Sequence, residues 1–293
     1  MAITEARPVA GRLILLLLGA AVLVGCEDTF DPFEESDLTF SVFGYVDVTA
    51  DTQYVRVAAL RQSAYEDAPV EAVVTLEDLE RGTAVALRDS VVGFRNGAFA
   101  HNFWTAAPVA PATTYRLTAT GPTGEAATAT FETPAPFPDP EFESGISQYS
   151  SPAFPPTAQS MRFTGIEQLA ELRITYVLAE PATTVTVSYL DRISVTPDSA
   201  LVVGFNAYAD VQRALSGTAG EACPSLIAAH VLIAAATAEW PDLVNLDPET
   251  LALPSTASNV EGGLGYVGGV ITRRGTWGSM QGVFSLHHQG CSE

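Results

Sequence analysis

Short alternating segments separated by regular turns occupy the chain from Leu38 to Thr133. Hydrophobic and polar residues alternate along each segment, as in Phe40-Ser41-Val42 and Val74-Thr75-Leu76. The stretches Asn96-Gly97 and Gly121-Pro122-Thr123-Gly124 are strong turn signals. Alternation of this kind over about 4–8 residues indicates strands with one buried face. Such strands, with a turn about every 8–12 residues, predict a β-sandwich.

The expected strands of this region are residues 38–48, 54–57, 70–79, 83–90, 98–104, 114–120 and 125–133. Strands of this number within about 100 residues match an immunoglobulin-like or fibronectin-like sandwich. The region has no internal cysteine pair, which excludes an antibody-type domain. We therefore predict an immunoglobulin/fibronectin-like β-sandwich over residues 38–134.

A proline-rich stretch follows the predicted sandwich. Proline removes the N–H that a strand ladder needs, so we expect residues 135–159 to form a linker, with a long surface crossing as the alternative. A second β-rich domain is predicted over residues 160–293, with one or two short helices. Its expected strands are residues 160–166, 170–178, 183–189, 193–205, 264–272 and 280–288, and its expected helix is 207–215. Residues 225–240 fit either a helix or a buried strand.

A charge-free apolar run from Leu13 to Gly25 follows two arginines, Arg7 and Arg12. It is shorter than the roughly 20 residues of a transmembrane helix and has the layout of a secretory signal. Its end, Leu23-Val24-Gly25-Cys26, resembles a bacterial lipobox. We therefore expect residues 1–25 to be a lipoprotein signal peptide and Cys26 to carry the lipid. The alternative is an ordinary signal peptide that leaves Cys26 free.

Acidic residues crowd the stretch just after Cys26. We expect residues 26–37 to be an acidic tether between the lipid and the first domain. The alternative is a surface-export signal, which such clusters provide in some Gram-negative lipoproteins. The acidic residues are Glu27, Asp28, Asp31, Glu34, Glu35 and Asp37.

The formal charge of the chain is −20. An acidic surface of this kind repels nucleic acid, so nucleic-acid binding is not expected. All 14 basic residues are arginine. The absence of lysine excludes a lysine Schiff base and the lysine of a phosphate-binding loop.

Cys223 and Cys291 are the cysteines that follow Cys26. An exported protein folds in an oxidising compartment, where such a pair can form a disulfide. The bond would close a long loop and hold the C-terminus in place. The alternative is two unpaired thiols.

No catalytic or metal-binding motif is recognisable. The four histidines, His101, His230, His287 and His288, form no H-E-x-x-H motif, and no G-x-S-x-G elbow is present. We therefore expect no catalytic residue, no metal and no cofactor. Aromatic residues either pack in the core or line a sugar or peptide surface. These are Trp104, Trp240, Trp277, Tyr149, Tyr189 and Tyr208.

A glycine-rich motif runs from Asn259 to Gly269. Its glycines are Gly262, Gly263, Gly265, Gly268 and Gly269. They indicate close backbone approach or unusual φ angles, so we expect a structural role, with a ligand-facing role as the alternative. The order strand, glycine loop, helix that a dinucleotide requires is missing here.

The motif resembles the N-x-x-G-G-L-G-x-F-G signature of a family of uncharacterised Gram-negative outer-membrane lipoproteins with a domain of unknown function. Phe43-Gly44-Tyr45-Val46 and residues 115–119 also resemble this family, whereas Val267 stands where phenylalanine is common. Genes of this family often neighbour TonB-dependent receptors. The resemblance implies a non-enzymatic, lipid-anchored outer-membrane protein that binds or assists such a receptor. The alternative is a structural or assembly factor of the envelope, and a cryptic hydrolase is the least favoured interpretation. The resemblance leaves open the ligand, the membrane face and the oligomeric state.

Overall fold

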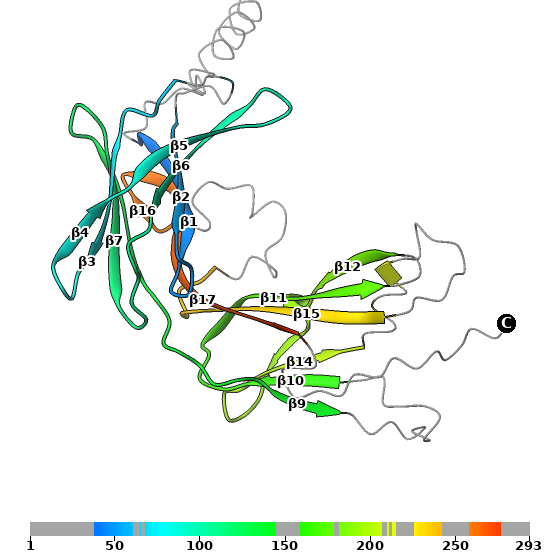
Figure 1. The fold of residues 1–293 in the computed structure, drawn as a ribbon. Coiled ribbons are helices and arrows are strands. Elements are labelled where there is room, and N and C mark those ends of the chain that lie inside the picture. Colours follow the sequence, from blue (N-terminus) through cyan, green and yellow to red (C-terminus); the bar gives the residue numbers. More distant parts are fainter. Residues whose placement is uncertain are drawn as a thin grey trace, which may run out of the picture. The chain divides into compact units, whose positions relative to one another are not determined.

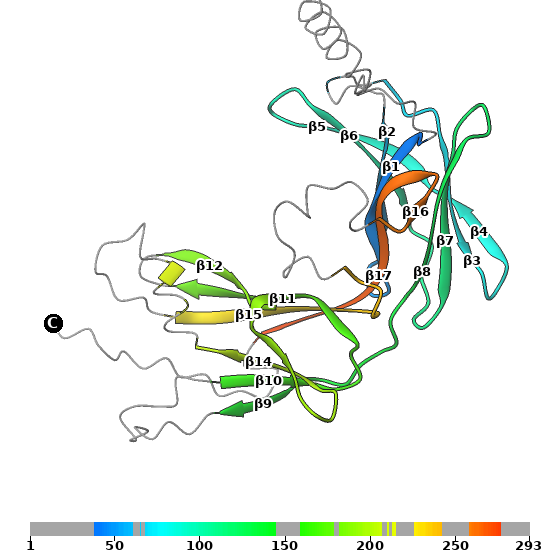
Figure 2. The same cartoon turned by 180° about the vertical axis from the view of Figure 1, so that it is seen from behind.

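The computed structural model describes residues 38–60, 65, 68–144, 159–178, 182–206, 210, 213–214, 226–241 and 258–276. The predicted lipidation site Cys26, the cysteine pair Cys223 and Cys291 and the expected strand at residues 280–288 lie outside these ranges. The fold is mainly β, with an immunoglobulin/fibronectin-like arrangement in its N-terminal part (Figures 1 and 2).

Two sheets enclose the N-terminal core. One contains the neighbours β1 (Phe40–Asp47), β2 (Gln53–Ala59), β6 (Phe99–Thr105) and β5 (Arg88–Gly93). The other contains β8 (Ala126–Glu132), β7 (Thr114–Thr120), β3 (Val73–Asp78) and β4 (Thr83–Ala86). Inward residues of both sheets meet in one cluster that includes Val42, Val55, Phe103 and Leu117. The alternation of hydrophobic and polar residues therefore predicts correctly which face of each strand is buried.

The segment expected as one strand at residues 83–90 is two strands. β4 pairs with β3, whereas β5 pairs with β6 in the opposite sheet. Leu87 lies between them, is buried, and donates its backbone N–H to the Val74 carbonyl at 2.8 Å. The chain thus crosses from one sheet to the other at Leu87, which continuous alternation in the sequence does not reveal.

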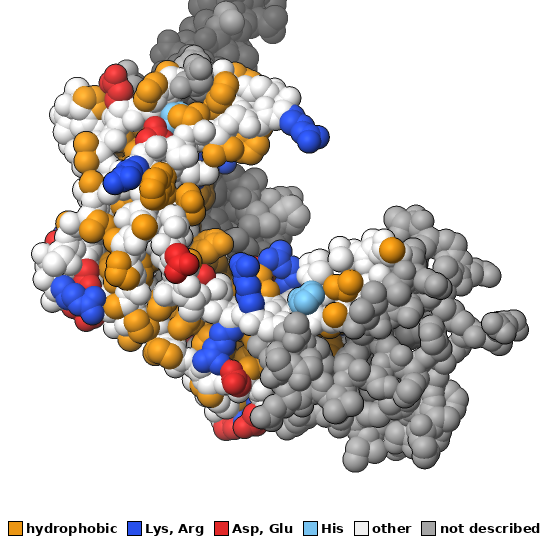
Figure 3. Space-filling model, viewed as in Figure 1, with side chains coloured by type: hydrophobic (Ala, Val, Ile, Leu, Met, Phe, Trp, Pro, Cys, Tyr) orange, Lys and Arg blue, Asp and Glu red, His pale blue; other side chains and the backbone are white. Residues whose placement is uncertain are grey.

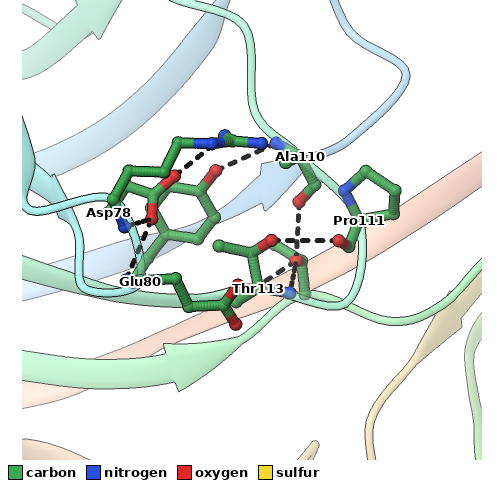
Figure 4. Close-up of polar contacts among 8 residues, drawn as sticks. Asp78, Glu80, Ala110, Pro111 and Thr113 are labelled. Atoms are coloured by element: carbon green, nitrogen blue, oxygen red, sulfur yellow. Dashed lines mark hydrogen bonds and ion pairs between the residues drawn. The ribbon is translucent and has the colours of Figure 1, made fainter.

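A tyrosine corner closes one end of this sandwich. The hydroxyl of Tyr115, near the start of β7, accepts a hydrogen bond from the Ala110 N–H at 2.9 Å. Thr113 supports the same turn by donating its hydroxyl to the Pro111 carbonyl at 3.0 Å (Figure 4). A tyrosine at this place, bonded to backbone a few residues upstream, is typical of immunoglobulin-like sandwiches. The contact therefore agrees with the fold class that the strand order indicates.

Two further groups of strands enclose a second core. One group is β12 (Thr183–Ser188), β11 (Gln168–Leu178) and β15 (Leu226–Ala236); the other is the sheet β13 (Ile193–Val195), β14 (Leu201–Phe205), β10 (Gln159–Phe163) and β9 (Glu141–Ser144). Buried side chains from both groups pack together, among them Phe163, Leu172, Tyr176 and Ile233. β9 lies inside the stretch expected to be a linker, and it pairs with β10.

The strand β17 (Gly263–Thr276) joins both groups of strands. Its first part pairs in parallel with β1, and its last part pairs antiparallel with β15. A single eight-stranded sheet results, with the order β12-β11-β15-β17-β1-β2-β6-β5. β16 (Val260–Glu261) adds to the other N-terminal sheet beside β8. Residues 259–270 are thus built into the N-terminal sandwich although more than 120 residues separate them from β8 in the sequence.

The ambiguous stretch at residues 225–240 contains the strand β15, not a helix. Buried valine and isoleucine side chains alternate with others along it, as in Val231 and Ile233. The strand expected at residues 264–272 continues to Thr276, so Arg273 and Arg274 also lie within β17. Of the residues expected to form a helix, Asp210, Arg213 and Ala214 are described and are helical.

Candidate functional site

The outward face of the eight-stranded sheet carries a group of aromatic and arginine side chains. We call this group the aromatic face: Phe43, Tyr45, Tyr54, Arg56, Arg88, Trp104 and Tyr266. Along β1, β2 and β6 these residues alternate with the buried side chains of the core, which places them on the outer side. Tyr266 and Arg88 lie beside them, because they pair with Phe43 and Trp104.

Strand register aligns the aromatic face into two rows. Tyr45 is opposite Tyr54, Tyr54 is opposite Trp104, and Trp104 is opposite Arg88. The next row runs from Tyr266 through Phe43, Arg56 and Asn102 to Ser90. Directly opposed residues on neighbouring strands lie about 5 Å apart, so the rings of the first row span about 10 Å across three strands.

Three rings of this face are open to solvent, and those of Trp104 and Tyr266 are partly buried. Phe43 is 52% exposed, and Tyr45 and Tyr54 are each 55% exposed. Large apolar side chains that are exposed side by side mark a binding surface more often than isolated ones do. Figure 3 shows hydrophobic side chains spread over the described surface in view, with charged side chains scattered among them. The strand register, in contrast, gathers five aromatic rings and two arginines in adjacent positions.

Cation and ring contacts organise both ends of the face. The guanidinium of Arg88 lies 5.4 Å from the centre of the Trp104 ring, within the range of a cation–π interaction. At the β17 end, Tyr266 meets Trp240 edge to face, with ring centres 5.5 Å apart. Burial, followed by the nearby Glu239 carboxylate, raises the pKa of Tyr266 to about 12. This phenol therefore stays neutral over the physiological range.

Gly268 makes room for the rings at that end. A Cβ at this position would lie 2.8 Å from Cε1 of Tyr266 and 3.0 Å from Cζ3 of Trp240. Gly268 is also the partner of Tyr45 across the β1–β17 ladder. Gly268 is therefore the next position of the first row after Tyr45, and the Tyr266 ring lies over it.

The other glycines of the motif lie where strand backbones approach closely. Gly262 and Gly265 have φ angles of +71° and +121°. A Cβ at Gly265 would lie 2.0 Å from the Val42 carbonyl oxygen, and one at Gly269 would lie 2.4 Å from that of Glu132. A Cβ at Gly263 would lie 2.6 Å from the Phe40 carbonyl oxygen. These positions exclude any side chain.

Asn259 holds the motif in register. Its Nδ2 donates to the Val267 carbonyl at 2.7 Å, and its Oδ1 accepts from the Val267 N–H at 2.9 Å. Its own backbone N–H donates to the Gly265 carbonyl at 3.1 Å. The side chain replaces a strand partner at this point, so the motif positions β17 and, through it, the Tyr266 end of the aromatic face.

The charge on the aromatic face differs from that of the whole chain. Acidic residues outnumber basic ones by 34 to 14 in the sequence. Within the described part of the two rows, the outward residues include Arg56 and Arg88 and no Asp or Glu. On the outer face of the opposite sheet, threonines alternate with core residues, and Glu77 and Glu132 are present. The aromatic face is thus a local cationic site on an acidic protein.

A buried polar network lies in the second core. Tyr176 and Tyr189 share a hydrogen bond of 2.7 Å between their hydroxyls, and Tyr189 donates to Asp210 Oδ2 at 2.9 Å. Arg192 donates to both carboxylate oxygens, at 2.8 and 3.0 Å. Burial would raise the pKa of Asp210, but hydrogen bonds from Arg192, Tyr189 and the Asn206 N–H outweigh it and lower that pKa.

For Tyr176 and Tyr189, in contrast, burial is the main cause and raises the pKa of each phenol. The network therefore holds Asp210 as a carboxylate and both phenols as neutral groups. It connects β11, the turn at Tyr189–Arg192 that follows β12, and the residues around Asp210, and it serves the packing of this core.

A histidine–carboxylate pair spans β5 and β6. His101 Nδ1 lies 2.9 Å from Asp89 Oδ2, and His101 is 5% exposed. Its buried Nε2 has no hydrogen-bond partner among the residues that the structure describes. A general base would need a nucleophile at this atom, so the pair does not form a catalytic triad. In the described part of the chain, no three His, Cys, Asp or Glu side chains are grouped to hold a metal ion.

The aromatic residues singled out from the sequence go to different places. Trp104 belongs to the aromatic face and Trp240 contacts it, whereas Tyr189 is buried in the second core. Trp277, Tyr149 and Tyr208 lie outside the described residues. Phe43, Tyr45 and Tyr54 were not predicted to be surface residues. The alternation of these rings with the buried Val42, Val46 and Val55 could have indicated that they face solvent.

No protein-family model matches the chain, and no curated protein matches its sequence. Among solved structures, chicken CNTN1 domains FN1–FN3 match 80% of this chain and 62% of theirs, at 12% identity and a TM-score of 0.28. Pullulanase from Anoxybacillus sp. LM18-11 matches 68% of this chain at 8% identity and a TM-score of 0.22. The chain spans 24% of the length of that pullulanase.

The described residues contain no helix of the length and hydropathy needed to cross a membrane.

Proposed function

We propose that this chain is a lipid-anchored outer-membrane protein that binds a ligand without catalysis, beside a TonB-dependent receptor. The lipobox-like sequence at Cys26 supports the anchor, and the family resemblance of the Asn259–Gly269 motif supports the place beside a receptor. In this proposal the lipid on Cys26 holds the protein at the membrane, and the β-sandwich presents the aromatic face.

The aromatic face is the observation that carries the binding role. Half-exposed rings cost free energy in water, because apolar surface there remains hydrated. Arg56 and Arg88 add directional hydrogen-bond donors beside the rings. The opposite sheet, which contains β7 and β8, has no comparable group of rings and arginines among its described residues. A rigid sheet that holds rings and cations in fixed positions recognises a ligand with little ordering cost.

Two measurements on the full chain test the proposal. Metabolic labelling with an alkyne fatty acid is expected to mark the wild-type protein and not Cys26→Ala. Affinity purification from detergent-solubilised membranes is expected to recover a TonB-dependent β-barrel with the wild-type protein. A protein that labels normally but repeatedly purifies without any such barrel contradicts the place beside a receptor.

A structural or assembly role is the second candidate, and the edge strand β5 favours it. β5 is the last strand of the eight-stranded sheet, and its Val91 and Val92 are 45% and 39% exposed. A free edge with apolar side chains can accept a strand from a partner. Replacing Val91 with proline would remove an N–H from this edge, because the ladder to β6 uses the alternate residues Val92 and Phe94, the latter donating to the Ala98 carbonyl. Loss of an envelope partner in this variant alone would favour the assembly role.

A further inference from the structure

We propose that the aromatic face binds an anionic polysaccharide, a sugar chain that carries carboxylate or sulfate groups. This inference rests on the proposed function and names the ligand class for its binding face. Three features of the face support it: the line of rings, the free arginines and the small polar residues between them.

The ring row matches an extended chain laid across the strands. Tyr45, Tyr54 and Trp104 follow one another on adjacent strands, and the row ends at Arg88. Ring faces stack against the apolar C–H faces of sugar rings, while hydroxyl groups at the sugar edges remain hydrated or bonded. A linear track therefore suits a polymer of ring-shaped units better than a compact solute.

Arginine chemistry selects the anionic class. A guanidinium offers a planar fork of donors that pairs with carboxylate or sulfate oxygens through two hydrogen bonds. No ion pair engages Arg56 or Arg88 in the described part of the chain, and Arg88 contacts the Trp104 ring instead. A charge of −20 repels anions at long range, but screening limits that repulsion to about 8 Å at physiological salt. Two unpaired cations at contact distance thus complement an anionic ligand.

The residues around the rings are small or neutral. Asn102 and Ser90 lie in the row of Arg56 and offer amide and hydroxyl groups to sugar hydroxyls. The following row has the short side chains of Ser41, Ala58 and Ala100 next to the rings, and the aliphatic Leu264 and Val92 lie only at its two ends. A folded protein partner would bury about 800 Å² of this chain and meet more aliphatic side chains in the centre of the contact. The composition therefore favours a glycan over a protein.

Isothermal titration calorimetry on the full lipidated chain in detergent micelles tests the inference. The probes are polygalacturonate as the carboxylate source, dextran sulfate as the sulfate source, and unmodified dextran as the neutral control. We expect binding to at least one anionic polymer and at least about tenfold weaker binding to neutral dextran. Preference for one anionic polymer identifies the source of the negative charge, and either preference supports the inference.

Matched variants assign the binding to the face. Trp104→Ala and Tyr54→Ala remove rings, and the pair Arg56→Gln with Arg88→Gln removes the cations. Each is expected to weaken binding about tenfold or more. Phe94→Ala removes a ring that is 52% exposed in the turn between β5 and β6, and Arg116→Gln removes an exposed arginine of the opposite sheet; both are expected to bind as wild type. Thermal unfolding followed by circular dichroism checks that every variant is folded.

Three results would overturn the inference: no binding of either anionic polymer, equal binding of neutral dextran, or equal losses in the control variants. Loss of a protein partner in the ring variants, with no glycan bound, would assign the face to a protein. Receptor recovery is measured on the same preparations. A recovered receptor without glycan binding leaves the proposed place beside a receptor intact, whereas glycan binding without a receptor leaves the ligand class intact.

Discussion

The amide side chain of Asn259 forms hydrogen bonds with both the C=O and the N–H of Val267. The Nδ2 atom donates to the carbonyl at 2.7 Å, and Oδ1 accepts from the N–H at 2.9 Å. Val267 is fully buried, so these backbone groups have no access to water. An amide is the side chain that satisfies a donor and an acceptor at once.

We expect Asn259→Leu to destabilise the protein by about 2–4 kcal/mol, because it leaves the Val267 N–H and C=O buried without partners. Urea unfolding followed by tryptophan fluorescence measures the change. Asn102→Leu, on the outer side of β6, is the control and should shift the free energy of unfolding by less than about 0.5 kcal/mol. Equal effects of the two substitutions would contradict the role assigned to Asn259.

Gly265→Ala should be among the most damaging single changes in the chain. The φ angle of +121° disfavours any side chain, and the new Cβ would lie 2.0 Å from the Val42 carbonyl oxygen. Strain and overpacking together predict a loss of about 3–5 kcal/mol. Gly204→Ala is the matched control, since a Cβ there meets nothing within 4 Å. Thermal unfolding of both variants measures the difference, and a Gly265→Ala protein as stable as wild type would refute the close approach of β17 to β1.

The Asp210 network gives the stability of the fold a defined response to acid. The pKa of Asp210 is lowered in the folded state, so its contribution is complete above its unfolded pKa and is lost as pH falls through the folded pKa. Asp210→Asn removes the ion pair with Arg192 and should cost about 2–3 kcal/mol at pH 7. Its free energy of unfolding should also depend less on pH below about 4 than that of wild type. Urea titrations between pH 2 and 7 compare the slopes, and parallel curves would count against the assignment.

Tyr189, in the same network, makes the free energy of unfolding depend on alkaline pH. Its folded-state pKa is raised, mainly by burial, so folding opposes its ionisation. The stability is therefore complete below the ordinary tyrosine pKa of about 10 and falls as pH rises above it. Tyr189→Phe should lose about 1 kcal/mol at pH 7 with the hydrogen bond to Asp210, yet decline less between pH 10 and 11.5. Tyr54→Phe, on the exposed face, is the control and should decline as wild type does.

Cys223 and Cys291 remain a predicted disulfide. Closing the loop between them is expected to add on the order of 4 kcal/mol, because the bond restricts the unfolded chain. Thiol titration of the denatured, unreduced protein should find neither cysteine reactive. Two reactive thiols per chain beyond Cys26 would rule the bond out, and the Cys223→Ser variant would then unfold at the wild-type urea concentration.

Strand identity was largely readable from the sequence. Alternation placed β1, β2, β7 and β8 within a few residues of their observed bounds, because the buried face of a strand must be apolar at every second residue. The break at Leu87 was not readable, since alternation continues while the chain changes sheets. Residues 225–240 were ambiguous because alanine favours helix while the β15 position, between β11 and β17, demands a strand.

The candidate site was only partly readable. Asn259 and the glycines that follow it stood out as a motif. Their partners in β1 and β8 are more than 120 residues away, and no local sequence pattern identifies those partners. Residue type and spacing were enough to predict a β-rich chain with alternating faces, an acidic charge and a glycine motif. The structure was needed to show that β17 enters between β1 and β15, and that Tyr45, Tyr54, Trp104 and Arg88 form one row. Register between distant strands depends on how side chains pack across the whole sheet, and that information is not local in the sequence.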